Sequence, residues 1–138
     1  MSLSSGQTLL KLGMRSAFSL PSPSGPQAAA AIIDAITPFI ALGKMPVPGG
    51  FIPTLPTGAP AAKALLMASY SSNKATTAEA ADDFAQSVAL IAPVVPRTGM
   101  QALKRGIQNA LDSKDSVAAK TDAIAKSIGQ YYSAGGAI

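Results

Sequence analysis

The 138-residue sequence contains no cysteine, no histidine and no tryptophan. Without cysteine, the chain can form no disulfide and no thiolate zinc site, and it has no thiol nucleophile. Histidine is the side chain that most often transfers protons in catalysis near neutral pH. Only seven Asp and Glu residues remain as alternatives. We therefore expect that the protein is not an enzyme and that it has no cofactor and no metal site.

The acidic residues and the glycines also lack the spacings of well-known sites. Asp82 and Asp83 are adjacent on an expected helix, so their side chains point about 100° apart. The segment with Asp112 and Asp115 lacks the glycine turn and the closing glutamate of a calcium loop. The glycines form no phosphate-binding loop, and no G-x-S-x-G elbow occurs. No enzyme class is supported by these patterns.

Aromatic side chains and long hydrophobic runs are scarce. Aromatic residues make up 5% of the chain, and much of the 48% apolar fraction is alanine, which buries little surface. We therefore expect an isolated monomer of marginal stability. The longest apolar stretch, residues 28–42, is interrupted by Asp34 and is shorter than the ~20 residues of a membrane span. Lys11 and Arg15 divide the N-terminal apolar residues, so no recognisable secretory signal is present.

The net charge of +4 arises entirely in the first half of the sequence. Up to residue 75 there are five basic residues and one acid, whereas six basic and six acidic residues follow. This uneven basic charge favours an acidic protein, a membrane surface or nucleic acid as a neighbour of the N-terminal half. In the second half, acids are interleaved with the basic residues and no aromatic stacking platform is evident, which argues against nucleic-acid binding.

Apolar residues that recur at three- and four-residue steps predict six helices. The expected ranges are 7–18, 24–42, 60–70, 76–92, 98–111 and 113–132. Thr76 with Glu79, and Thr98 with Gln101, match the capping box of a helix start. The predicted fold class is all-α, a small irregular bundle of about five to six helices with a long extended arm rich in proline and glycine. An N-terminal amphipathic helix, residues 1–20, precedes a single helical domain, residues 21–138.

The helix expected at 24–42 has no polar face and is predicted to be central and buried. Its large side chains are Ile32, Ile33, Ile36, Phe39 and Ile40. Pro38 lacks the N–H that would bond the Asp34 carbonyl, which predicts a kink or an early helix end. Asp34 itself is expected either to be buried against a lysine or backbone donor or to face a partner.

The arm, residues 44–60, contains five prolines and three glycines, so no helix can run through it. At ~3.1 Å per residue, such a segment could extend over roughly 50 Å. It also contains five large apolar side chains that we predict to bind a partner: Met45, Val47, Phe51, Ile52 and Leu55. The competing interpretation is an internal strap, in which the same residues are buried against the protein's own helices.

These features together resemble the composition of small structural subunits of viral particles and other large assemblies. The sequence therefore predicts a non-enzymatic structural or assembly subunit, with a tailed-phage virion component as the first hypothesis. Its expected partners are other protein subunits, and its expected location is a virion or a cytoplasmic assembly. The alternatives are a membrane-associating protein, which would use the N-terminal helix and residues 28–42, and a small adaptor or chaperone.

Overall fold

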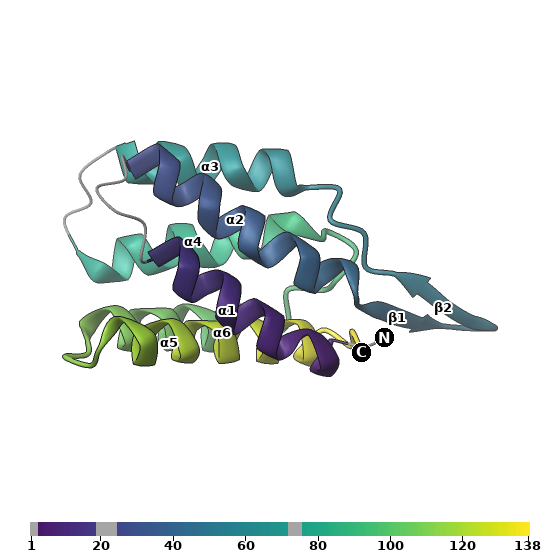
Figure 1. Cartoon of the computed structure of the whole chain (residues 1–138). Helices are drawn as coiled ribbons and strands as arrows, with labels where there is room; N and C mark the ends of the chain where they lie inside the picture. Colours follow the sequence, from purple (N-terminus) through teal and green to yellow (C-terminus); the bar gives the residue numbers. More distant parts are fainter. Residues whose placement is uncertain (1–2, 19–24, 72–75) are drawn as a thin grey trace.

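A computed structural model describes residues 3–18, 25–71 and 76–138 of the chain (Figure 1). Helices dominate this part of the chain, and the all-α prediction is confirmed. A short 3-10 helix, η1 (Ser4–Gly6), precedes the first α-helix. The elements that follow are α1 (Gln7–Phe18), α2 (Gly25–Ala41), β1 (Lys44–Val47), β2 (Gly50–Pro53), α3 (Ala59–Ser71), α4 (Thr77–Ile91), α5 (Met100–Asp112) and α6 (Val117–Ala134).

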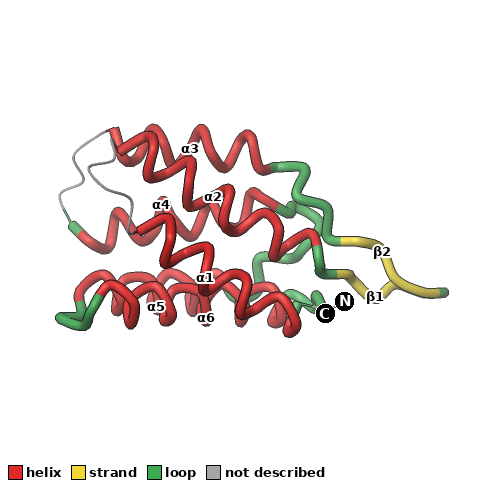
Figure 2. The backbone as a smooth tube through the Cα atoms, viewed as in Figure 1, coloured by secondary structure: helices red, strands yellow, loops and turns green. Residues whose placement is uncertain are grey.

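The helices form a closed bundle. Each α-helix packs against its neighbours in sequence, and α1 also packs against α6, so the first and last helices complete the circuit. The helices run alternately toward and away from the end that carries β1 and β2 (Figure 2). Leu3, the first described residue, and Ile138 both lie close to the start of β1. All six α-helices contribute to one hydrophobic core.

Helix α2 supplies the largest share of bulky core side chains. Its four isoleucines and Phe39 are buried, as the sequence predicted. Close approach of α1 is possible because Gly13 lies against Ala35, where an added Cβ would be 3.1 Å from the alanine Cβ. Full burial of one isoleucine contributes about 1.5–3 kcal/mol, so this helix is a main source of stability.

The early helix end predicted at Pro38 does not occur, because α2 continues to Ala41. Phe39 and Ile40, which follow the proline, are both fully buried. Burial of these two side chains, about 1.5–3 kcal/mol each, offsets the cost of about 3 kcal/mol that a proline inside a helix carries. Asp34 is paired with a lysine as predicted, but it is exposed and not buried: its carboxylate lies 2.8 Å from Lys63 Nζ.

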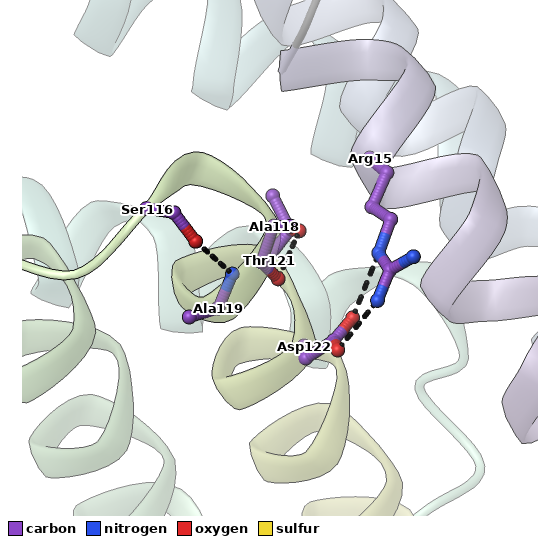
Figure 3. Close-up of polar contacts among 6 residues, drawn as sticks. All are labelled: Arg15, Ser116, Ala118, Ala119, Thr121 and Asp122. Carbon is purple, nitrogen blue, oxygen red and sulfur yellow. Dashed lines mark hydrogen bonds and ion pairs between the residues drawn. The ribbon is translucent and has the colours of Figure 1, made fainter.

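Of the three helix starts predicted at Thr76, Thr98 and Ser113, the first is confirmed and the other two are wrong. Thr76 caps α4, where its hydroxyl accepts a hydrogen bond from the Glu79 N–H. Thr98 caps nothing, because the residue at the N-cap of α5 is Gly99. Helix α6 begins at Val117, because the Ser116 hydroxyl accepts a hydrogen bond from the Ala119 N–H and caps the helix (Figure 3). Ser113, the predicted start, instead caps the end of α5, where its hydroxyl donates to the Ala110 carbonyl.

Candidate assembly surface at the hairpin

Residues 44–53 form an antiparallel hairpin that projects beyond the helices (Figure 1). The sequence predicted one extended arm, but the chain turns back at Pro48 and Gly49. Proline fixes φ near −65°, and Gly49 has φ +90°, the combination that a type II turn requires at its central residues. The reversal brings Met45 opposite Ile52 and Pro46 opposite Phe51. Because the chain folds back, the segment extends about half as far from the bundle as a linear arm would.

The base of the hairpin is fixed to the bundle by backbone contacts. Thr54 is buried; its hydroxyl donates to the Ile40 carbonyl at 2.6 Å, and its N–H donates to the Gly43 carbonyl at 3.0 Å. On the other side, Lys44 and Ile138 exchange two backbone hydrogen bonds of 2.9 and 2.8 Å. These bonds hold both strands at the end of α2 and beside the C-terminal residues.

The pairing register divides the hairpin side chains between two faces, because successive residues of a strand point to opposite sides. Met45, Val47 and Ile52 share one face. Pro46 and Phe51 share the other, and there the Lys44 ammonium lies 4.6 Å from the centroid of the Phe51 ring. This cation–π contact places a positive charge directly beside the largest apolar side chain of the hairpin.

Four of the five predicted partner-binding residues are exposed to solvent. The exposed fractions are 37% for Val47, 56% for Phe51, 38% for Ile52 and 55% for Leu55. Met45 differs, because it is half-buried and packs against the core. The strap interpretation requires Phe51 and Leu55 to be buried against the protein's own helices. Their exposure does not agree with that interpretation. Binding of a partner at these residues stays a prediction.

An apolar groove of about 310 Å³ adjoins the hairpin. It is lined by Ile52, Pro53, Leu55, Thr57, Pro93 and Val94. Sequence reasoning missed the contribution of Val94, because residues 93–96 were interpreted only as the end of a helix. No local signal distinguishes Val94, which is exposed, from the adjacent Val95, which is buried. The groove extends the exposed apolar surface from the hairpin onto the loop after α4.

The free edges of the hairpin offer little for strand addition. The backbone N–H and C=O of Lys44 point away from β2 and bond to Ile138. In an antiparallel pair the backbone groups of every second residue point outward, so those of Pro46, Phe51 and Pro53 also face away from the partner strand. Prolines have no N–H to donate, so Phe51 alone keeps an outward N–H donor at these edges. A partner would therefore contact side chains, since edges of this kind disfavour added strands.

The hairpin end of the molecule has no acidic side chain, because residues 35–78, 84–111 and 123–138 contain no Asp or Glu. Its basic residues include Lys44 and Arg97. Arg97 is close enough to Tyr131, near the end of α6, to oppose the rise in the pKa of Tyr131 that burial causes. The charged side chains that accompany the exposed apolar surface are therefore basic.

Ion pairs among the described residues join neighbouring helices. Arg15 forms two hydrogen bonds with the Asp122 carboxylate, 2.7 and 3.1 Å long, and joins α1 to α6 (Figure 3). The hydrogen bond and the charge of Asp122 raise the pKa of Arg15, and the hydrogen bond from Arg15 is the main cause that lowers the pKa of Asp122. Lys104 pairs with Asp82 at 2.6 Å.

Within residues 3–18, 25–71 and 76–138, no cluster of three or more metal-ligating His, Cys, Asp or Glu side chains occurs. Over the same residues, no helix has the length and apolar character that crossing a membrane requires. No protein-family model, no curated protein and no solved structure matches the chain.

Proposed function

We propose that the protein is a non-enzymatic structural subunit that joins a larger protein assembly through its hairpin and the adjoining groove. The observation that supports this most is the exposure of Val47, Phe51, Ile52 and Leu55 on an element that projects from the bundle. Exposed apolar side chains that gather at a projecting element are characteristic of interaction sites in soluble proteins. The composition resembles that of small structural subunits of viral particles and other large assemblies, and a tailed-phage virion is the assembly that we propose first.

The rigidity of the hairpin also favours tight binding of a partner. A flexible arm loses conformational entropy when a partner orders it, whereas this hairpin is already held by its turn and its base. Its prolines reduce that cost further, because they restrict the backbone before binding. More of the free energy gained by burying Phe51 and Leu55 therefore remains as affinity.

The membrane-associating alternative has less support from the packing. It requires residues 28–42 at a bilayer, but the isoleucines of this segment and Phe39 are in the core. An adaptor or chaperone would also expose an apolar surface. It differs from a structural subunit in stoichiometry, because a subunit sediments with its particle in a fixed ratio and a chaperone is released.

The test is the double variant Phe51→Ser with Leu55→Ser, produced in place of the parent chain in the cells that make the assembly. We expect the isolated variant to keep the circular dichroism and melting temperature of the parent, but to be absent from the sedimented particle. The matched control is Leu9→Ser with Leu12→Ser, which removes two equally exposed leucines, 48% and 58%, from α1.

Two outcomes would contradict the proposal. Incorporation of the hairpin variant at the parental ratio would show that these side chains contact no partner. A much lower melting temperature of the isolated hairpin variant would instead show that Phe51 and Leu55 stabilise the monomer.

A further inference from the structure

The hydroxyl of Tyr131, near the end of α6, is a buried polar group without a partner. The residue is 2% exposed, and no group among the described residues forms a hydrogen bond with its Oη. The hydroxyl of the adjacent Tyr132, in contrast, donates to the Val88 carbonyl. Buried polar groups are nearly always hydrogen-bonded in native proteins, and an exception often indicates strain, a functional role or a bound ion.

Tyr131 lines a cavity of about 150 Å³ between the first turn of α5 and the last two turns of α6. The other lining residues are Gly99, Ala102, Leu103, Ser127, Gln130 and Ala134. An added Cβ at Gly99 would lie 3.3 Å from the Ala134 Cβ and 3.5 Å from the Tyr131 Cα, so the absence of a side chain there keeps the cavity open. Pockets that enclose a whole small molecule measure about 300–1,000 Å³. This cavity is therefore suited to a single ionic group.

The N-terminus of α5 opens onto the same cavity, through Gly99 and Ala102. Gly99 is the N-cap residue and has no side chain that could accept a hydrogen bond from the first-turn N–H groups. These N–H groups have no partner within the helix, and the helix dipole gives this end a partial positive charge. No Asp or Glu occurs in residues 84–111 or 123–138. Neither α5 near its start nor α6 near its end therefore supplies a negative charge.

Arg97 adds a full positive charge beside these donors. It precedes the N-cap residue by two positions, and its carbonyl accepts a hydrogen bond of 3.2 Å from the Met100 N–H. Burial raises the pKa of Tyr131, and the charge of Arg97 opposes that rise, so the guanidinium is close to the phenol. The ion pairs among the described residues do not include Arg97. Its charge is thus available to an anion.

We propose that this cavity binds a phosphate group, either free phosphate or the phosphoryl group of a monoester. The first-turn N–H groups of α5, the Tyr131 hydroxyl and the Arg97 guanidinium donate hydrogen bonds to its oxygens. Helix N-termini bind phosphate through such N–H groups, and an arginine adds a charge-assisted hydrogen bond. The site shares no residue with the hairpin and its groove, so this inference is independent of the proposed function.

The experiment is isothermal titration calorimetry of the full chain with two probes, inorganic phosphate and O-phosphoserine. Ionic strength is held constant with sodium chloride, because salt screens exposed charges. We expect the parent to bind one phosphate group. Tyr131→Phe and Arg97→Gln should each bind at least about tenfold more weakly, because each loses a hydrogen bond to a charged group. Tighter binding of O-phosphoserine than of inorganic phosphate would identify a monoester as the source of the group, and the reverse would identify the free ion.

Three control variants keep the cavity intact and should bind phosphate like the parent. Arg105→Gln removes a positive charge from the exposed face of the same helix. Tyr132→Phe removes a buried hydroxyl that already has a partner, so it should lower the melting temperature without changing the affinity. The double variant Phe51→Ser with Leu55→Ser changes only the hairpin segment, which separates this site from the proposed function.

A thermal melt distinguishes a binding role of Tyr131 from a structural one. Without phosphate, Tyr131→Phe should melt at or above the temperature of the parent, because it removes a buried hydroxyl that has no partner. With phosphate, the melting temperature of the parent should rise more than that of the variant, since a ligand stabilises the folded state that binds it. Failure of the folded parent to bind either probe, or equal affinities of the parent, Tyr131→Phe and Arg97→Gln, would overturn the site.

Discussion

Helix α2 and the hairpin that follows it are both rich in large apolar side chains, but they place those side chains oppositely. The isoleucines of α2 and Phe39 are fully buried, whereas Val47, Phe51, Ile52 and Leu55 remain exposed. Spacing decides the difference: α2 repeats its large residues every three or four positions, which gives one face to bury. In the hairpin, prolines prevent that repeat. Hydrophobic content therefore does not identify the core unless its periodicity is considered as well.

The two regions are also held in place by different interactions. The helices are stabilised by side-chain burial, and the hairpin by the turn at Pro48–Gly49 and the backbone bonds at its base. Substitutions that remove apolar surface should accordingly destabilise the first region and leave the stability of the second unchanged. The predictions below test this contrast.

The largest effect is expected from Ile36→Asp. A lone carboxylate at this fully buried position has no partner, and the cost of about 5 kcal/mol or more is comparable with the total stability of a small domain. The matched control is Ile52→Asp on the hairpin, which should keep the parental melt. Thermal unfolding followed by circular dichroism measures both. A stable Ile36→Asp protein would show that α2 is not core, and an unfolded Ile52→Asp protein would remove the contrast between the regions.

A smaller loss is expected from Gly58→Ala, where the hairpin segment returns to the helices. The Gly58 N–H donates to the Ile91 carbonyl, and an added Cβ would overlap the Leu90 carbonyl oxygen. The backbone at Gly58 or at Leu90 must then move. We therefore expect the free energy of unfolding, measured with urea, to decrease by about 3 kcal/mol. Gly49→Ala is the control, because it has open space but a positive φ and should cost only about 1–2 kcal/mol. Equal losses would mean that the overlap is relieved cheaply.

The sequence predicted the helices better than the hairpin, for physical reasons. The range of α1 was predicted as observed, and α2 lies within one residue of its predicted ends, because local periodicity determines both. The cap at Thr98 and the start at Ser113 failed, because several residues in each segment could begin a helix and tertiary packing selects among them. For the hairpin, the Pro48–Gly49 pair between apolar residues was a usable turn signal.

The candidate surface was only partly predictable. Phe51 and Leu55 followed from composition, because apolar residues among prolines cannot join a helix. The contribution of Val94 and the pairing of Lys44 with Ile138 depend on distant parts of the chain meeting. No local pattern encodes such contacts.

Alkaline pH should weaken the bundle before it affects the hairpin, which contains no tyrosine. Burial raises the pKa of Tyr70 to about 12, and it raises those of Tyr131 and Tyr132 as well. The unfolded phenol ionises near pH 10, so the stabilisation is complete below pH 10 and is lost as the pH rises toward 12. At pH 11, Tyr70 alone accounts for a loss of about 1.4 kcal/mol.

Urea unfolding at pH 8 and pH 11 measures this loss, and Tyr70→Phe provides the control, since it should remove the part due to Tyr70. Phenolate absorbance of the native protein should remain low at pH 11. Full ionisation near pH 10 in the folded state would contradict the burial of all three rings.

The smallest effect is expected from Asp122→Asn, which breaks the pair between α1 and α6 at a solvent-exposed position. The pKa of Asp122 is lowered by Arg15, so the stabilisation is present above the ordinary pKa of an aspartate and is lost as the pH falls through the lowered value. Surface pairs are screened by water and salt, and we expect only a slight decrease in melting temperature at pH 7. As the pH falls through that lowered pKa, the parent and the variant should converge, because the parent carboxylate is then protonated. Arg15→Gln should reproduce the decrease, and the double variant should add little to it. A decrease as large as that of Gly58→Ala would mean that a single exposed ion pair, and not the burial of Leu10 and Met14, holds α1 on the bundle.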